Sequence, residues 1–386
     1  MSTSLQVHGS VSPGFESIKQ LYEQQMQTMA EQDTQLCVYY RGERVVDLWA
    51  SAKSNSSAPG NAFSADSLVN VFSSGKSLEA IAIASLVSKG LISYDARITQ
   101  YWPEFGANGK DELTVAELMR HEAGLANFHT AIDLEDLFTE NIKRNAIGRI
   151  IEAHAQTYDA ASGSKREYHA LTRGWIVNEV FRRVDPEGRT IGEFLREEIS
   201  GPLDADAIVG VKAQDMQRIA RVQMLSPGFQ LLESLKPRVL GRRIVHNFFQ
   251  IMARLVMFLP LLVKARRAGI PPPFAGFGQT DYFNDPGFAG GETPSANANC
   301  SARGLAKIAA MLAAGGKWQG TEYLSEQAWA AMHANPVKAH MGKLLTTRFT
   351  QGGVDSFTAC DPQCTACERD LNQGREGFYG WMGFGG

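Results

Sequence analysis

Ser73-Ser74-Gly75-Lys76 stands where a short apolar run, residues 68–72, meets a helical pattern that extends to Lys89 and stops at Gly90. Ser73 and Lys76 are three residues apart, so both side chains project from one face of the helix. A serine hydroxyl becomes a nucleophile when a base removes its proton, and a lysine can be that base if burial or positive charge lowers its pKa. The helix N-terminus also suits a developing oxyanion near Ser73. A serine cap followed by a surface lysine is the other interpretation.

The sequence around this tetrad resembles a known family. Residues 90–98 read GLISYDARI, residues 101–105 read YWPEF and residues 113–125 read LTVAELMRHEAGL. This order is similar to that of the serine β-lactamase and penicillin-binding-protein superfamily, and most of all to its class C β-lactamase-like esterases. The resemblance extends from about residue 35 to residue 386 and is weakest over 205–275.

The resemblance assigns roles to individual residues. Ser73 is implied to be the acylated nucleophile and Lys76 its base. Tyr168, in Tyr168-His169-Ala170, matches the second acid/base, and Ala170 replaces an asparagine of the β-lactamases, as in the esterases. A nearby ammonium would favour the phenolate of Tyr168, while a buried aromatic with a satisfied hydroxyl is the alternative. His169 is expected either to touch substrate or to pack.

The third family element is found near the end of the chain. No Lys-Thr-Gly occurs, and Trp381-Met382-Gly383 fits the W-x-G form of the esterases. The N–H of Phe384 would join that of Ser73 in the oxyanion hole. Loss of the motif lysine favours neutral esters over substrates with a carboxylate, so amide or β-lactam cleavage is the weaker expectation. The glycine allows the strand backbone to approach the substrate closely.

The end of the chain motivates a second hypothesis. The family usually continues with two more strands and a helix, whereas this sequence stops at Gly386. We therefore expect an incomplete sheet, and activity is in doubt at this point. The alternative to a serine hydrolase is a non-catalytic or truncated scaffold protein that retains the fold.

Composition excludes several classes of protein. The 386 residues have a net charge of −3, with 44% hydrophobic and 20% charged residues, so a bulk nucleic-acid binder is not expected. The N-terminus has no signal-peptide pattern, which makes the cytoplasm the default location. The apolar stretch 244–263 is interrupted by Arg254 and Pro260 and is too short to span a bilayer. Residues 242–267 combine arginine pairs with apolar residues, which leaves two interpretations. The segment touches a membrane or roofs an acyl pocket, or it forms a helix whose apolar face is buried.

Metal and cofactor sites are not expected. Cys360, Cys364 and Cys367 lack a nearby fourth ligand and are interpreted as a loop of free thiols. His121-Glu122 does not continue as H-E-x-x-H, because Leu125 takes the place of the second histidine. A G-x-S-x-G motif is absent, which disfavours an α/β-hydrolase.

Local patterns predict an α+β fold in one domain, 1–386. Its sheet lobe is expected at about 10–75 and 295–386, with both ends in one antiparallel sheet, and its helical lobe at about 76–294. Strands 35–40 and 45–50 should form a hairpin. Helices are expected at 15–31, 73–89, 114–120, 171–184, 189–199 and 301–314 and in most of 207–270. A loop is expected at 281–298.

Overall fold

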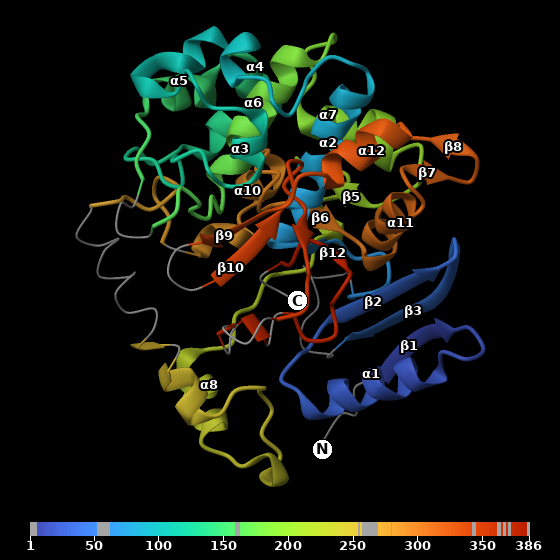
Figure 1. The fold of residues 1–386 in the computed structure, drawn as a ribbon. Coiled ribbons are helices and arrows are strands. Elements are labelled where there is room, and N and C mark those ends of the chain that lie inside the picture. The colour runs from blue at the N-terminus through green and yellow to red at the C-terminus, as the bar shows by residue number, and fades with distance from the viewer. Residues whose placement is uncertain are drawn as a thin grey trace.

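A computed structural model of the protein describes residues 6–51, 62–158, 163–253, 255–256, 269–278, 280–341, 345–360, 364–365, 368–369 and 372–383. Helices and antiparallel strands mix along the chain, so the predicted α+β class is confirmed (Figure 1). Helices gather in one lobe at the top of the view, and the N-terminal strands lie at the opposite end.

The N-terminal part of the chain builds a small sheet of its own. Strands β1 (Gln6–Val11), β3 (Glu43–Ser51) and β2 (Thr34–Tyr40) pair in this order, and helix α1 (Glu16–Thr28) packs against them. Arg41 and Gly42, at the tip of the β2–β3 hairpin, have φ of 53° and 83°. Positive φ at both positions matches the twist of a two-residue hairpin turn. The predicted hairpin and first helix are confirmed, whereas β1 was not predicted.

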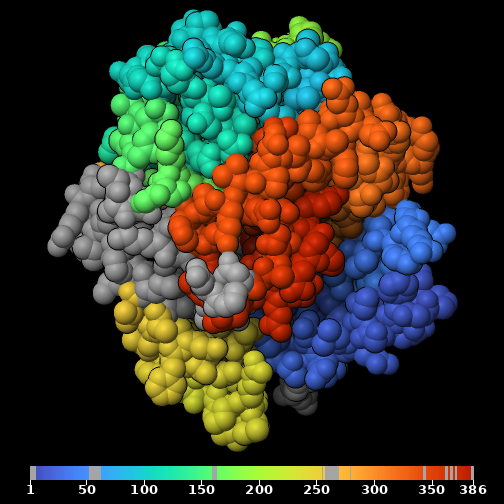
Figure 2. Space-filling view, in the orientation of Figure 1, coloured from blue at the N-terminus to red at the C-terminus, as the bar shows by residue number. Residues whose placement is uncertain are grey.

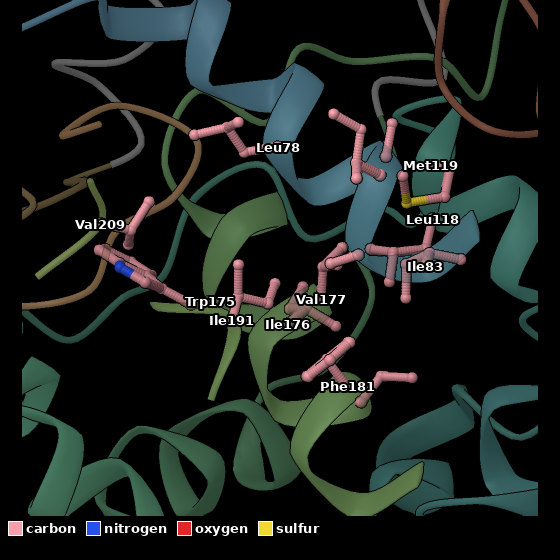
Figure 3. Packing of buried hydrophobic residues seen from close by; sticks show 14 of the residues in the cluster. Leu78, Ile83, Leu118, Met119, Trp175, Ile176, Val177, Phe181, Ile191 and Val209 are labelled. Atoms are coloured by element: carbon pink, nitrogen blue, oxygen red, sulfur yellow. The ribbon is translucent and has the colours of Figure 1, made fainter. Parts of the chain in front are cut away.

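Two long helices form the centre of the helical lobe. They are α2 (Lys76–Ser88), which is buried throughout Lys76–Leu86, and α6 (Thr172–Val184). Around them lie α3 (Val115–Met119), α4 (Thr139–Lys143), α5 (Ala146–Ala153), α7 (Ile191–Phe194) and the π-helical segment η6 (Leu195–Ser200). Their apolar side chains interlock in one large core (Figure 3). A helix buried on all sides explains why apolar residues occur around the whole circumference of α2.

The C-terminal part of the chain returns across the helical lobe. It contains α10 (Pro286–Gly290), α11 (Ala302–Ala313), the β7 (Lys317–Trp318) and β8 (Thr321–Glu322) hairpin, and α12 (Glu326–His333). A four-stranded antiparallel sheet follows, with β9 (Val337–Met341), β10 (Leu345–Phe349), β11 (Asp355–Ser356) and β12 (Tyr379–Gly380) in sequence order. A third sheet joins β4 (Val69–Asn70), β6 (Asn299–Cys300) and β5 (Ala207–Ile208), with β6 in the middle.

The expectation that the two ends of the chain share one sheet is wrong for the described residues. β1–β3 and β9–β12 pair only within their own sheets. β12 has two residues, and Gly377 before it has a φ of 82°. So short a strand, entered through a turn, offers little backbone for pairing with a strand of the N-terminal sheet.

The helical expectation for 207–270 is also largely wrong. The described part contains α8 (Pro227–Ser234), helical turns within 248–256, and the short 3₁₀ segments η7 (Met216–Arg218) and η8 (Arg238–Leu240). A buried apolar face is not found either, because Val245 and Phe249 are exposed. The remainder of the apolar stretch, 257–268, lies outside the described residues.

Candidate active site

Ser73 lies on a tight turn between a strand and a buried helix. After β4, residues Phe72–Gly75 form the 3₁₀ segment η1, which continues directly into α2. Phe72 has a φ of 47°, a left-handed conformation that costs energy for a bulky residue. The Asn70 side chain holds this turn by accepting a hydrogen bond from the Phe72 N–H at 2.8 Å. The turn presents the Ser73 side chain outside the helix.

Three predicted side chains meet at this turn. The Ser73 Oγ lies 2.5 Å from the Tyr168 hydroxyl, and the Lys76 Nζ donates to the Ser73 Oγ at 3.5 Å. Tyr168 belongs to the segment just before α6, so the site joins positions 95 residues apart in sequence. Serine, lysine and tyrosine therefore form one hydrogen-bonded group.

Lys76 is buried, with 2% of its surface exposed. Its Nζ also donates to the carbonyl oxygens of Ala170 and Ser295, both at 3.0 Å. The pKa of Lys76 is lowered to about 7, mainly by burial; the Glu79 charge opposes the shift and the Arg173 charge adds to it. A substantial neutral fraction of this amine is therefore present near neutral pH, as a general base requires.

The predicted ionisation of Tyr168 is wrong in direction. Desolvation raises the pKa of the phenol above its ordinary value although 38% of Tyr168 is exposed, and the hydrogen bond with Ser73 only partly offsets this. The Lys76 Nζ lies 4.9 Å from the centroid of the Tyr168 ring, over its face. An ammonium in that position interacts with the π-system of the ring more directly than it interacts with the phenol oxygen. Tyr168 is accordingly a neutral hydroxyl, suited to donate a proton.

A buried ion pair lies beneath Lys76. The Arg173 Nε is 2.8 Å from the Glu79 Oε2, and both side chains are completely buried. The Ser295 hydroxyl donates to the other Glu79 oxygen, and the Arg173 Nη1 donates to the Met119 carbonyl at 2.9 Å. Sequence reasoning missed this pair. Its signal is Glu79, the single acidic residue of α2, three residues after Lys76.

The loop that carries Ser295 is held by a second buried carboxylate, Glu292. Thr139, Asn178 and Thr190 donate side-chain hydrogen bonds to it, and the Gly192 N–H donates at 3.0 Å. These partners fix the loop within the expected loop 281–298. They also fix the Ser295 carbonyl against Lys76.

The predicted W-x-G segment lies beside the nucleophile turn. The Ser74 Oγ donates to the Trp381 carbonyl at 3.3 Å, and the Trp381 Nε1 donates to the Gly353 carbonyl at 2.9 Å. A Cβ on Gly383 would lie 2.5 Å from the Val71 carbonyl oxygen. Glycine is therefore required for this approach of the strand to the turn. Phe384, the predicted oxyanion donor, lies outside the described residues.

His169 is fully buried and engaged by the backbone. Its Nε2 accepts from the Leu125 N–H at 3.1 Å, and its Nδ1 pairs with the Glu167 carbonyl at 2.6 Å. Burial lowers its pKa to about 4, so the ring is neutral. Of the two roles predicted for His169, this geometry favours packing. His121 is likewise buried, 5.0 Å from the Tyr168 ring.

Within the described ranges, no three His, Cys, Asp or Glu side chains are grouped so that they could hold a metal ion. Cys360 and Cys364 are thiols, and Cys367 lies outside those ranges. In the part of the chain that the structure describes, no helix is long and apolar enough to cross a membrane.

Comparisons with known proteins agree with this geometry. The family model for Beta-lactamase matches residues 18–386. Esterase/beta-lactamase LipL of Mycobacterium tuberculosis is 30% identical over 327 residues, which is 83% of this chain and 68% of that protein.

Two solved structures show the same fold. One is a penicillin-binding protein homologue from Caulobacter crescentus, 24% identical with a TM-score of 0.70, over 98% of this chain and 88% of that one. The other is a family VIII carboxylesterase, also 24% identical, with a TM-score of 0.71, over 99% and 89% of the two chains.

Proposed function

Since the chain belongs to the beta-lactamase family, we propose that it is a serine hydrolase that cleaves esters through an acyl-enzyme, with Ser73 as its nucleophile. The observation that carries the proposal is the contact of the Ser73 Oγ with both the Tyr168 hydroxyl and the Lys76 amine. A nucleophile needs a base within reach, and a lysine with a pKa of about 7 supplies one.

Acylation uses the three side chains in turn. The neutral amine of Lys76 takes the Ser73 proton while Oγ attacks the ester carbonyl carbon. The backbone N–H groups of Ser73 and Phe384 stabilise the resulting oxyanion. As the carbon–oxygen bond to the alcohol breaks, Tyr168 gives its proton to the departing oxygen and regains one from the Lys76 ammonium. The acyl group is then bound to Ser73 and Lys76 is neutral again.

In deacylation, water is the nucleophile and the Ser73 Oγ is the leaving group. A water molecule attacks the acyl carbon and gives one proton to Lys76. The bond to Ser73 Oγ then breaks, Oγ recovers that proton, and the carboxylic acid leaves. No metal or cofactor takes part in this proposal.

The substrate is proposed to be a neutral ester. Trp381-Met382-Gly383 takes the place of a lysine-bearing motif, so the proposed substrate edge has no motif cation to bind a carboxylate. The name of the relative LipL motivates β-lactam hydrolysis as a second candidate. Comparing p-nitrophenyl butyrate with nitrocefin separates them, because β-lactam turnover as fast as ester turnover would favour the second.

A fluorophosphonate probe tests the nucleophile directly. We expect labelling of the wild type, loss of labelling in Ser73→Ala and full labelling in Ser93→Ala, an exposed serine after α2. If the wild type is labelled no more than Ser73→Ala, the assignment of Ser73 fails. Absence of both labelling and ester turnover would instead favour a non-catalytic scaffold.

A further inference from the structure

A group of apolar side chains is exposed on the segment that follows residue 220. Val239 is 91% exposed, Phe249 80% and Leu240 71%. Their neighbours Leu232, Leu235 and Val245 are each more than half exposed. Single exposed apolar residues are ordinary, but six within eighteen consecutive positions mark an interaction surface. We call these six residues, with Arg238, Arg242 and Arg243, the basic apolar surface.

The charge of this segment differs from that of the whole chain. Residues 221–256 contain six basic residues and one acidic residue, in a protein of net charge −3. The acidic residue, Glu233, is buried and forms an ion pair with Lys236. It also accepts a hydrogen bond from the Arg243 N–H at 2.9 Å. The charge that this segment presents to solvent is therefore positive.

The segment projects from the body of the molecule. Figure 1 shows α8 below the helical lobe, and Figure 2 shows the same residues, in yellow, as a protrusion beside the N-terminal elements. The segment is held to the body at several points: Leu68 pairs with Ile219 just before it, the Asn284 side chain hydrogen-bonds the Val222 backbone, and the Arg243 carbonyl accepts from the Ala30 N–H at 2.9 Å. The exposed apolar side chains of this segment are therefore available to contact a membrane or a partner.

We propose that the basic apolar surface docks the protein on an anionic lipid bilayer. Apolar side chains that enter the interface combine with arginines that attract anionic headgroups, and each effect alone gives weak binding. The charge pattern selects this occupant over a second copy of the chain, because two identical positive surfaces repel each other. The inference concerns where the protein works and does not depend on the proposed chemistry.

Co-sedimentation of the full chain with vesicles tests the proposal. We expect binding to phosphatidylcholine vesicles that contain phosphatidylserine and little binding to phosphatidylcholine alone. Raising the salt from about 0.1 M to about 1 M shortens the Debye length from about 10 Å to about 3 Å and should weaken binding. Equal binding to both vesicles, or binding to neither, would overturn the proposal without any variant.

Two sets of substitutions locate the contact. Arg238→Gln/Arg242→Gln/Arg243→Gln should reduce affinity on the order of 100-fold. Leu232→Ser/Val239→Ser/Phe249→Ser should reduce it by about tenfold or more. Tyr40→Ser, which changes a 52% exposed ring at the hairpin tip, is the matched control and should bind like the wild type. Unchanged binding in both triple variants would refute the assignment to this surface.

Sedimentation velocity without lipid tests whether the basic apolar surface instead binds a second copy of the chain. We expect the wild type and the apolar triple variant to have the same oligomeric state. A wild-type oligomer that the apolar substitutions dissociate would show that the surface binds a second copy, and the lipid proposal would be wrong.

Discussion

At the residue scale, the burial of Lys76 favours the proposed chemistry but lowers the free energy of unfolding. Its pKa is about 7 in the folded protein and 10.5 in the unfolded chain, so the unfolded chain binds the proton more readily. This cost to folding is fully present below pH 7 and is lost as pH rises toward 10.5. We predict that Lys76→Met lowers kcat/KM by about 10²–10⁴-fold and raises the free energy of unfolding.

The pH dependence of that gain is the measurement. Urea unfolding of both proteins should show the largest advantage of Lys76→Met below pH 7 and a smaller one above it. The carbonyls of Ala170 and Ser295 lose their donor in the variant, which limits the gain. A variant less stable than the wild type at every pH would contradict the argument.

The pH–rate profile is a second prediction at this scale. Since the neutral amine is the proposed base, kcat/KM for a neutral ester should rise with pH through about 7 and then level off. The raised pKa of Tyr168 keeps the phenol protonated across this range. An acid limb near the ordinary pKa of a carboxyl group would instead indicate a different base.

Glu79 and Arg173 give a third prediction. Both are completely buried, so Glu79→Gln or Arg173→Met alone leaves an unpaired charge and should cost about 3–5 kcal/mol of unfolding free energy. The double variant removes both charges and should recover most of this loss. A double-mutant cycle from urea unfolding measures the coupling, and simple addition of the two single losses would show that the pair is not coupled.

At the scale of elements, the site depends on a close approach between η1 and the loop 292–297. A Cβ on Gly75 would lie 2.4 Å from the Pro294 carbonyl oxygen. Gly75→Ala should therefore displace the loop that carries the Ser295 carbonyl, lowering both esterase activity and stability, the latter by about 1–3 kcal/mol. Gly228→Ala is the matched control, because no atom lies within 4 Å of its added Cβ. Thermal unfolding and ester turnover of the two variants are the readouts, and wild-type behaviour of Gly75→Ala would be the contrary result.

The elements that the sequence predicts well are those with local signals. The helices expected at 114–120 and 301–314 begin with a Thr114–Glu117 capping box and the N-cap Ser301, and the expected hairpin turns at Arg41-Gly42. The separation of the sheets depends on distant partners instead. The site divides in the same way: Ser73, Lys76 and Tyr168 could be found from motifs, whereas the pairing of Glu79 with Arg173 is decided by packing of α2 on α6.

At the scale of the whole molecule, the candidate site is assembled from four distant parts of the chain. Ser73 and Lys76 come from η1 and α2, and Tyr168 precedes α6. Ser295 comes from the loop after α10, and Trp381 follows β12. The geometry of the site therefore requires the large core around α2 and α6 to be folded. The small N-terminal cluster contributes none of these side chains.

That separation gives the last prediction. Met26, Val46 and their neighbours form an apolar cluster distinct from the large core. The contacts that join the two parts are mostly polar and include the Asp47–Arg303 ion pair at 2.9 Å and the Ala302 N–H to Gln35 Oε1 hydrogen bond at 2.8 Å, beside a ring contact of Tyr39 with Trp318. Polar contacts couple two parts of a molecule less cooperatively than a shared apolar core does, so the N-terminal elements should open locally.

Hydrogen exchange read by mass spectrometry measures this opening. Amides of residues 6–51 should exchange faster than those of α2 and α6. Met26→Ala, at a position 1% exposed, should speed exchange in residues 6–51 while fluorophosphonate labelling of Ser73 stays unchanged. Met119→Ala is the matched truncation in the large core and should speed exchange in α2 and α6 as well. If Met26→Ala accelerates exchange in α2 and α6 as much as in β3, the molecule unfolds as one unit, and the site then depends on the N-terminal cluster after all.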